Sequence, residues 1–570
     1  MSWFWFFAIE CGMIAAKSWG KKEERNFMEK KTALSEEKKQ WLIVAAIMLV
    51  GILVRLLFVG RYPAGLNQDE ASAGYDAFAV LNYGIDRNGI HNPMHLIAWG
   101  SGQNMAYSWL CMPFIALFGL SAVTVRVPMA IVGSISVALF YFFLKNIRGE
   151  DKRLVYLGTF LFAVFPWHIM KSRWGLESNL FPDLILWGVV LLSFFLKNRK
   201  GIFLYLGYFL FGFSAYAYGS AYCFLPFFVL PLTVYLYCTK RAELRQLFLA
   251  MLILAVVVLP VLVFLFINTF DYPQIDLGLF TIPRLYANRH TEMASVFSRD
   301  FLAKSWRNIT GALKILAVQD DGLPWNAIRY FGLTYPITLP LTLWGLFVSL
   351  RNFRRRNETG GEFLMDFWLL SSAVLLFVVE PNINRINIIM IPWMYYTAVG
   401  TTELARNIRG GVRTAAAVYG VFFLLFVGTY FTRYQATIGY SFFEGLGDAI
   451  VQSSQENASR IYVTDDVNQP YIFALFYNRT DPNLYRDTVQ YKSQYAAFEE
   501  IAGFDKYVFG IPETIDPTEN AVYVFGWQES SKFPETEFEI TQWSHYSVAV
   551  PKESNGFCVA GAAVVPQNLE

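Results

Sequence analysis

Cysteine, histidine and charge are all scarce in this sequence. Its 570 residues include five cysteines and five histidines, and only 16% are Asp, Glu, Lys or Arg. The cysteines are odd in number and lack metal-ligand spacing, so neither a disulfide framework nor a zinc site is indicated. The net charge of +2 arises from short basic clusters rather than an extended basic patch, so nucleic acid is not an expected partner.

Hydrophobic side chains dominate instead. They make up 55% of the residues, and aromatic side chains make up 18%, which is too apolar for an ordinary soluble protein. About eleven apolar runs of about 17–23 residues could each cross a bilayer, which predicts a polytopic α-helical protein embedded among membrane lipids. The runs lie near 41–59, 127–144, 154–170, 180–196, 201–217, 220–237, 246–268, 331–350, 363–380, 386–403 and 412–431.

Lysine and arginine clusters set the expected orientation in the cell membrane. They occur before the first run and after every second run, and the positive-inside rule assigns such clusters to the cytoplasm. The N-terminus is then cytoplasmic, and the segments 60–126, 171–179 and 269–330, the short turn 381–385 and everything after about 432 face outward. The clusters lie at 17–39, 145–153, 197–200, 240–245, 351–356 and 406–413.

Three parts follow from this pattern. Residues 1–40 form a cytoplasmic segment, whose apolar stretch 3–16 is interfacial because it is too short to span. Residues 41–431 form the transmembrane domain. Within it, 105–119 contains Pro113 and is expected to dip into the outer leaflet rather than to cross it.

Residues 432–570 are expected to form an extracytoplasmic α/β domain. The stretches "IYVTDD" and "AVYVFGWQ" are typical of short strands. The stretches "PYIFALFYN" and "FEGLGDAIVQSS" are typical of helices, and Asp-Pro turns separate some of these elements.

Ionisable residues gather on the outward face, where their cost at a membrane edge raises a functional question. Asp69 and Glu70 follow the first run, and Glu177 lies in the second outward segment. Arg385 lies in the very short turn between two later runs. Together they supply a candidate general base and a candidate phosphate clamp.

Each residue also has a simpler interpretation. Asp69 could cap the helix that begins at "EASAGYDAFAVL", and Arg385 could be an interfacial residue that reaches toward the headgroups. His168, beside Trp167, could belong to the aromatic belt at the membrane interface. Asp320 and Asp321 could form a solvated turn, or else line the side of the site where the acceptor binds.

Three stretches resemble a known family. They are "YPAGLNQDEASAGYDAFAVL" after the first run, "GLSAVTVRVPMAIVGSISVALFYFF" at the second, and "FPWHIMKSRWGLESNL" before the fourth. All are similar to bacterial members of glycosyltransferase family 39, which includes dolichyl-phosphate-mannose protein mannosyltransferases and aminoarabinose transferases within the C superfamily (GT-C) of glycosyltransferases. The resemblance covers roughly residues 41–400 and the start of the outer domain.

This resemblance implies an inverting enzyme that moves a sugar from a polyprenyl phosphate to an acceptor outside the cell. The implied catalytic acids are Asp69, as general base, with Glu70 and Glu177. Arg385 is the implied phosphate-binding arginine. Position and charge add Arg173, Arg126 and His168 to the phosphate-binding candidates. Glu70 and Glu177 are also candidate ligands for a divalent cation, Mg²⁺ or Mn²⁺.

The acceptor stays open among protein, lipid and cell-wall glycopolymer. The aromatic and histidine residues that follow the Asp-Glu pair in the protein mannosyltransferases are absent, and 269–330 shows no inserted domain. Both departures weaken a protein acceptor. The alternative functions are a transporter or flippase of lipid-linked sugars, an oligosaccharide ligase that uses a pyrophosphate-linked donor, and a membrane-anchored binding protein that acts through its outer domain.

Overall fold

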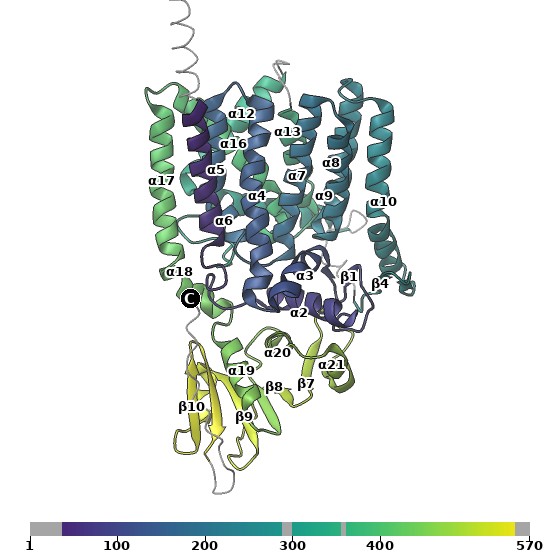
Figure 1. Ribbon diagram of the computed structural model, residues 1–570, viewed down its shortest axis with the longest axis vertical. Coiled ribbons are helices and arrows are strands. Elements are labelled where there is room, and N and C mark those ends of the chain that lie inside the picture. The colour runs from purple at the N-terminus through teal and green to yellow at the C-terminus, as the bar shows by residue number, and fades with distance from the viewer. Residues whose placement is uncertain (1–36, 288–298, 355–360, 553–570) are drawn as a thin grey trace, which may run out of the picture.

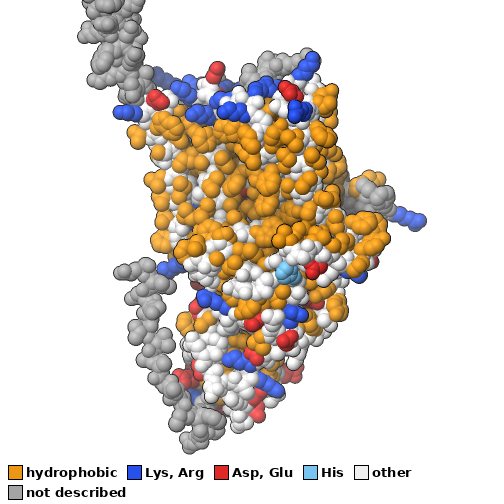
Figure 2. Space-filling model, turned by 45° about the vertical axis from the view of Figure 1, so that its right-hand side comes forward, with side chains coloured by type: hydrophobic (Ala, Val, Ile, Leu, Met, Phe, Trp, Pro, Cys, Tyr) orange, Lys and Arg blue, Asp and Glu red, His pale blue; other side chains and the backbone are white. Residues whose placement is uncertain are grey.

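The computed structural model describes residues 37–287, 299–354 and 361–552. The expected interfacial stretch 3–16 lies outside these residues. The described chain forms a bundle of long, roughly parallel helices, with a separate layer of strands and short helices at one end (Figure 1). Side chains on the bundle surface form a hydrophobic belt, and Lys and Arg gather at the end of the belt that is remote from the strand layer (Figure 2).

Six helices in the described part of the chain are long and apolar enough to cross a membrane. Together with the belt, they make this a multi-pass membrane protein. The six are Glu37–Leu56, α4 (Ala122–Arg148), α7 (Glu177–Asn198), α9 (Ser220–Cys238), α10 (Leu244–Thr269) and α17 (Gly411–Tyr430).

The other expected spans are shorter or interrupted, so the number of about eleven stays a prediction. The run at 154–170 is broken into α5 (Lys152–Val164) and α6 (Pro166–Lys171). Pro166 begins α6 because proline lacks the N–H that a helix interior needs. The remaining pieces are α8 (Gly201–Phe213) with η1 (Ser214–Tyr216), η3 (Pro336–Thr338) with α12 (Leu339–Arg354), α13 (Phe363–Ser372) with α14 (Leu375–Val378), and α15 (Ile383–Ile386) with η4 (Asn387–Ile389) and α16 (Met390–Arg406).

Short elements cover the end of the bundle that faces the strand layer (Figure 1). The first loop forms α2 (Gln68–Tyr83), the small hairpin of β1 (His95–Leu96) and β2 (Gln103–Asn104), and α3 (Ala106–Phe118). At 13 residues, α3 is too short to span. Later segments add β3 (Ile275–Asp276), β4 (Thr281–Ile282) and α11 (Phe301–Val318).

A seven-stranded mixed sheet is the centre of the layer beyond the bundle, with the order β10-β11-β9-β5-β8-β7-β6. Strand β5 pairs in parallel with both β8 and β9. The strands are β5 (Arg460–Val463), β6 (Gln490–Ser493), β7 (Glu500–Phe504), β8 (Tyr507–Phe509), β9 (Ala521–Gly526), β10 (Phe538–Trp543) and β11 (Tyr546–Pro551). The helices are α18 (Arg433–Ser441), α19 (Leu446–Gln455), α20 (Pro470–Asn478) and α21 (Pro482–Thr488), and η5 (Trp527–Lys532) follows β9.

This outer domain packs directly on the first loop. The Tyr75 hydroxyl donates to the Thr480 carbonyl at 2.8 Å, and the Glu499 amide donates to the Trp99 carbonyl at 2.9 Å. Buried apolar residues of α2, α20 and the sheet belong to one hydrophobic core that continues into the bundle. The outer domain is therefore part of the structure that shapes this end of the bundle.

Candidate active site

A cavity of about 340 Å³ lies where the loops at this end of the bundle meet the outer domain. Asp69 from α2, Glu177 from α7 and Arg385 from α15 all line it, so three residues far apart in the sequence are brought together. The remaining lining is mainly polar: Gln68, Trp99, Gly102, Gln103, Leu176, Ser178, Tyr218, Asn382, Asn384, Asn468, Gln469 and Phe498.

Asp69 reaches the cavity because another residue caps its helix. The Asn67 side chain accepts from the Asp69 amide at 2.9 Å. The Glu70 carboxylate accepts from the Asn67 amide at 3.2 Å, which completes a capping box. The interpretation of Asp69 as the cap is therefore wrong. In the first turn of α2, its carboxylate is also favoured by the helix dipole.

Glu70 points away from the cavity and holds the structure together. Its two carboxylate oxygens accept from Arg126 Nε at 2.8 Å and Arg126 Nη2 at 2.7 Å, and the Gly175 amide donates a further bond at 2.7 Å. Both charged side chains are completely buried. Glu70 was expected to be catalytic and Arg126 to bind the donor phosphate. Both expectations are corrected, because the two side chains form a buried ion pair with each other.

Glu177 is the first residue of α7. Its Oε2 accepts from the Asn104 amide at 2.6 Å, and the Asn104 side chain is fixed in turn by Tyr222 Oη at 2.9 Å. Asp69 and Glu177 both line the cavity. Two carboxylates from different loops therefore face the same space.

Arg385 lies on a tightly anchored loop. The Asn382 side chain accepts from the Arg385 amide at 2.8 Å, and Ser220 donates to the Arg385 carbonyl at 3.0 Å. The guanidinium is 3.6 Å from the Glu380 carboxylate and 27% exposed, and the residue lines the cavity.

Asp321 supports this loop from outside the cavity. Its Oδ2 accepts from the Ile383 amide and from Asn326 Nδ2, both at 2.8 Å. Partial burial raises the pKa of the Asp321 carboxyl. Asp320 accepts from the Gly322 amide in an exposed turn. Neither carboxylate lines the cavity, so the expectation that they form the acceptor side is not supported by the geometry.

Arg173 and His168 are also buried away from the cavity, contrary to expectation. The Arg173 guanidinium donates to four backbone carbonyls at the end of the first described helix and the turn after it, and it stacks on the aromatic rings of Tyr430 and Phe431. His168 lies between Arg55, at 2.7 Å, and Asp183, at 3.3 Å. These partners occupy both side chains in structural roles.

The expected cation site is not assembled. Glu177 lines the cavity and Glu70 does not, and the Glu70 oxygens already accept hydrogen bonds from Arg126 and Gly175. Among the described residues, no group of three or more His, Cys, Asp or Glu side chains could hold a metal ion. The residues present therefore do not fit the divalent cation that the resemblance suggested.

Sequence reasoning missed the amide and hydroxyl groups of the cavity. Ser178, next to Glu177, has a buried Oγ with no hydrogen-bond partner, and it lines the cavity. Asn468 and Gln469 come from the outer domain, nearly 400 residues after Asp69. Asn468 and Gln469 belong to a run of polar residues just before α20, and no sequence pattern indicates that this run contacts the first loop.

The fold of the chain is similar to that of solved protein structures. No family model and no curated protein matches the sequence. ArnT from Cupriavidus metallidurans, solved with bound undecaprenyl phosphate, aligns over 89% of this chain and 97% of its own, with a TM-score of 0.54 and 12% identity. The apo structure of ArnT gives the same TM-score and covers 90% of this chain and 98% of its own.

The chain has the GT-C glycosyltransferase fold. The GT-C likeness is weaker for the archaeal oligosaccharyltransferase AglB from Archaeoglobus fulgidus, solved with an inhibitory peptide and a dolichol phosphate. It has a TM-score of 0.46 and 12% identity over 78% of this chain and 64% of that one. The GT-C fold agrees with the resemblance seen in the sequence, and it says nothing yet about donor or acceptor.

Proposed function

We propose that this protein is a membrane glycosyltransferase that moves a sugar from a polyprenyl-phosphate donor to an acceptor hydroxyl outside the cytoplasm. The observation that carries the proposal is the convergence of Asp69, Glu177 and Arg385 in one cavity. A base, a second carboxylate and a cation are what this reaction needs, and the likeness to ArnT solved with undecaprenyl phosphate supports that class of donor.

Asp69 acts as the general base in this scheme. The acceptor oxygen attacks the anomeric carbon, its proton passes to Asp69, and the bond from that carbon to the phosphate oxygen breaks, with inversion. A positioned carboxylate contributes about 10²–10⁴-fold to such a step. Glu177, fixed by Asn104, orients the attacking hydroxyl.

Arg385 binds the donor phosphate. Negative charge increases on the phosphate as the glycosidic bond breaks, and a fixed guanidinium stabilises that charge more in the transition state than in the ground state. The lipid tail lies against the hydrophobic belt beside the cavity. No step of this scheme uses a metal ion.

The orientation of the protein follows the same proposal. Lys and Arg at the end of the bundle remote from the outer domain support a cytoplasmic location for that end (Figure 2). The cavity and the outer domain would then face outward, where the sugar phosphate supplies the energy of transfer and no nucleotide is required.

The decisive variant is Asp69→Asn, which keeps the size of the side chain and removes the base. We expect release of polyprenyl phosphate from a labelled donor to fall by about 10²-fold or more, while the melting temperature in detergent is unchanged. Asp487→Asn is the matched control, because Asp487 is exposed on α21 and does not line the cavity. Normal transfer by Asp69→Asn would refute the proposal.

The same assay separates the alternatives. A flippase would relocate the donor without releasing polyprenyl phosphate. An oligosaccharide ligase would consume a pyrophosphate-linked donor in preference to the monophosphate. Donor profiling with both carriers therefore distinguishes each alternative from the proposed reaction.

A further inference from the structure

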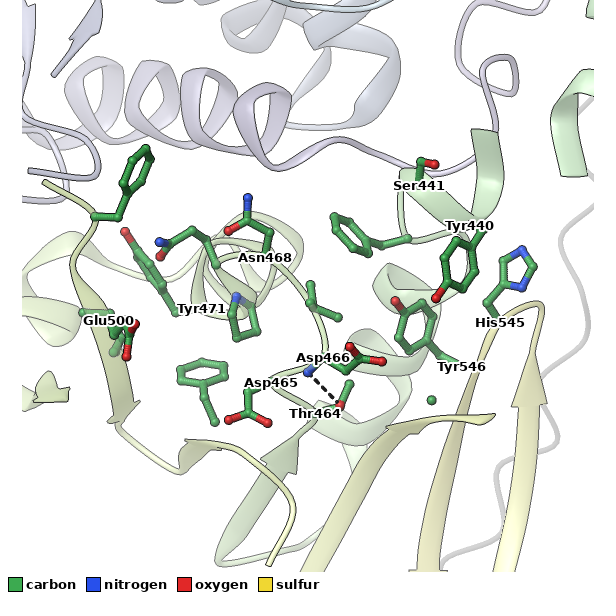
Figure 3. A pocket seen from close by; sticks show the side chains of 18 of the residues that line it. Tyr440, Ser441, Thr464, Asp465, Asp466, Asn468, Tyr471, Glu500, His545 and Tyr546 are labelled. Atoms are coloured by element: carbon green, nitrogen blue, oxygen red, sulfur yellow. Dashed lines mark hydrogen bonds between the residues drawn. The ribbon is translucent and has the colours of Figure 1, made fainter. Parts of the chain in front are cut away.

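A second cavity, of about 740 Å³, lies in the outer domain next to the candidate active site. Its volume falls within the range of about 300–1,000 Å³ that is usual for ligand pockets. Figure 3 shows Tyr440, His545 and Tyr546 on one side, Glu500 on the other, and the loop with Asp465 and Asp466 between them. Nothing in the proposed reaction has yet used this space.

The cavity lies at the position where open α/β sheets bind ligands. The loop from Thr464 to Gln469 follows β5, and Phe509, Gly526 and Trp527 lie at the ends of β8 and β9. Strand β5 runs parallel to both neighbours. The lining therefore gathers at the carboxyl ends of three parallel strands, where open α/β sheets form binding crevices.

Exposed aromatic rings and hydrogen-bonding groups alternate around the lining. Trp527 is 68% exposed, Tyr440 is 55% exposed and Phe498 is 48% exposed, and exposed aromatic rings grouped around one cavity are typical of a binding surface. Asp466 and Glu500 are exposed carboxylates that can accept hydroxyl hydrogen bonds. Aromatic faces pack on the C–H faces of sugar rings, so this combination fits a carbohydrate.

The charge of the lining selects among carbohydrates. Asp465 is paired with Lys492 at 3.1 Å, so that cation is already balanced. Asp466 and Glu500 then leave the cavity with excess negative charge, and a chain of phosphates or carboxylates would be repelled. A neutral, hydroxyl-rich chain avoids that repulsion and satisfies the carboxylates.

The two cavities share a wall formed by Asn468, Gln469 and Phe498, each of which lines both. Gln469 holds a left-handed backbone, with φ 57° and ψ 58°, although it is not glycine. Residues held in such sparsely populated conformations are concentrated at functional sites. A carbohydrate chain bound in the outer cavity would therefore be separated from the Asp69 cavity only by the turn that contains Gln469.

We propose that the outer cavity binds a neutral carbohydrate chain as the acceptor and presents its terminal hydroxyl to Asp69 past Gln469. This inference rests on the proposed function for the identity of the reaction, but the binding site stands on its own geometry. Under this proposal, the outer domain determines the acceptor specificity of the enzyme.

Binding is tested on an array of neutral and anionic oligosaccharides and Ser/Thr peptides, probed with the full-length protein in detergent. We expect binding to neutral oligosaccharides. Trp527→Ala, and the pair Asp466→Asn with Glu500→Gln, should each weaken it by about tenfold. The pair Glu513→Gln with Glu539→Gln removes the same charge from exposed positions outside the cavity and should bind normally.

The outcomes separate this inference from the proposed function. Asp69→Asn should retain oligosaccharide binding while transfer is lost. Binding without transfer by the wild type would leave the inference standing and remove the proposed function. Binding only to peptides or anionic chains, binding to nothing on the array, or wild-type affinity in the Trp527→Ala variant would overturn the inference.

Discussion

Two adjacent acids have opposite roles at the scale of single residues. Successive residues on a helix point about 100° apart, so Asp69 can face the cavity while Glu70 faces Arg126. The buried pair keeps one carboxylate and one arginine out of the cavity, whereas Asp69 and Arg385 line it. Glu177 lines it too, held by a backbone amide.

Arg385→Gln tests the phosphate role. The variant keeps hydrogen-bonding capacity and loses the charge that stabilises the departing phosphate, so we expect kcat/KM to fall by about 10²–10³-fold. Arg329→Gln is the matched control, since Arg329 is exposed on a neighbouring loop and does not line the cavity. An equal response of the two variants would argue against a phosphate at Arg385.

The buried pair of Glu70 and Arg126 fixes whole elements relative to one another. Arg126, in the second turn of α4, also donates to the carbonyls of Pro63 and Gly65, both at 2.7 Å, and Glu70 accepts from the amide of Gly175 before α7. One charge pair therefore ties α2, α4 and the loop that leads to Glu177. The position of Asp69 depends on this junction.

Glu70→Gln should destabilise the protein, because it leaves Arg126 as a buried, uncompensated charge, at a cost of about 3–5 kcal/mol. We expect a melting temperature in detergent lowered by several degrees, in contrast to Asp69→Asn. Glu150→Gln, at an exposed position, is the control and should melt normally. A Glu70→Gln variant with wild-type stability and no transfer would instead restore Glu70 to the catalytic residues.

At the scale of the whole molecule, a polar network lies beneath the outer domain. Arg87 pairs with Asp76 at 2.6 Å, lies over the Trp99 ring and donates to Tyr471 Oη of α20 at 3.4 Å. Next to it, Asp86 is buried, and its Oδ2 has no hydrogen-bond partner. Burial, followed by the charge of Asp76, raises the pKa of Asp86 to about 7.

This raised pKa predicts a pH dependence of stability. The unfolded carboxyl ionises near pH 4 and the folded one near pH 7, so the folded state loses stability as pH rises between these values. The cost at pH 8 is on the order of 2–4 kcal/mol. Asp86→Asn, which keeps the acceptor for the Asn88 and Ile90 amides, should therefore flatten the decline in melting temperature from pH 5 to 8. Identical slopes would contradict the assignment.

Local sequence patterns were sufficient for much of the fold. The bounds of α20 match the "PYIFALFYN" stretch, β9 falls within "AVYVFGWQ", and β5 begins one residue before "IYVTDD". Short interruptions were harder to foresee, because Pro166 breaks an apolar run that hydropathy alone reads as continuous. The cavity residues Asp69, Glu177 and Arg385 were identified from residue type and side of the membrane.

The sequence by itself determined the membrane-embedded helices and the charged loops, because apolar length and residue type are local properties. It could not show which charged residues line the cavity and which form buried structural contacts. Only the tertiary structure decided that Arg126, Arg173 and His168 are buried against partners, and that Arg385 and Gln469 line the same cavity as Asp69. Those outcomes depend on contacts between segments hundreds of residues apart, which no local pattern specifies.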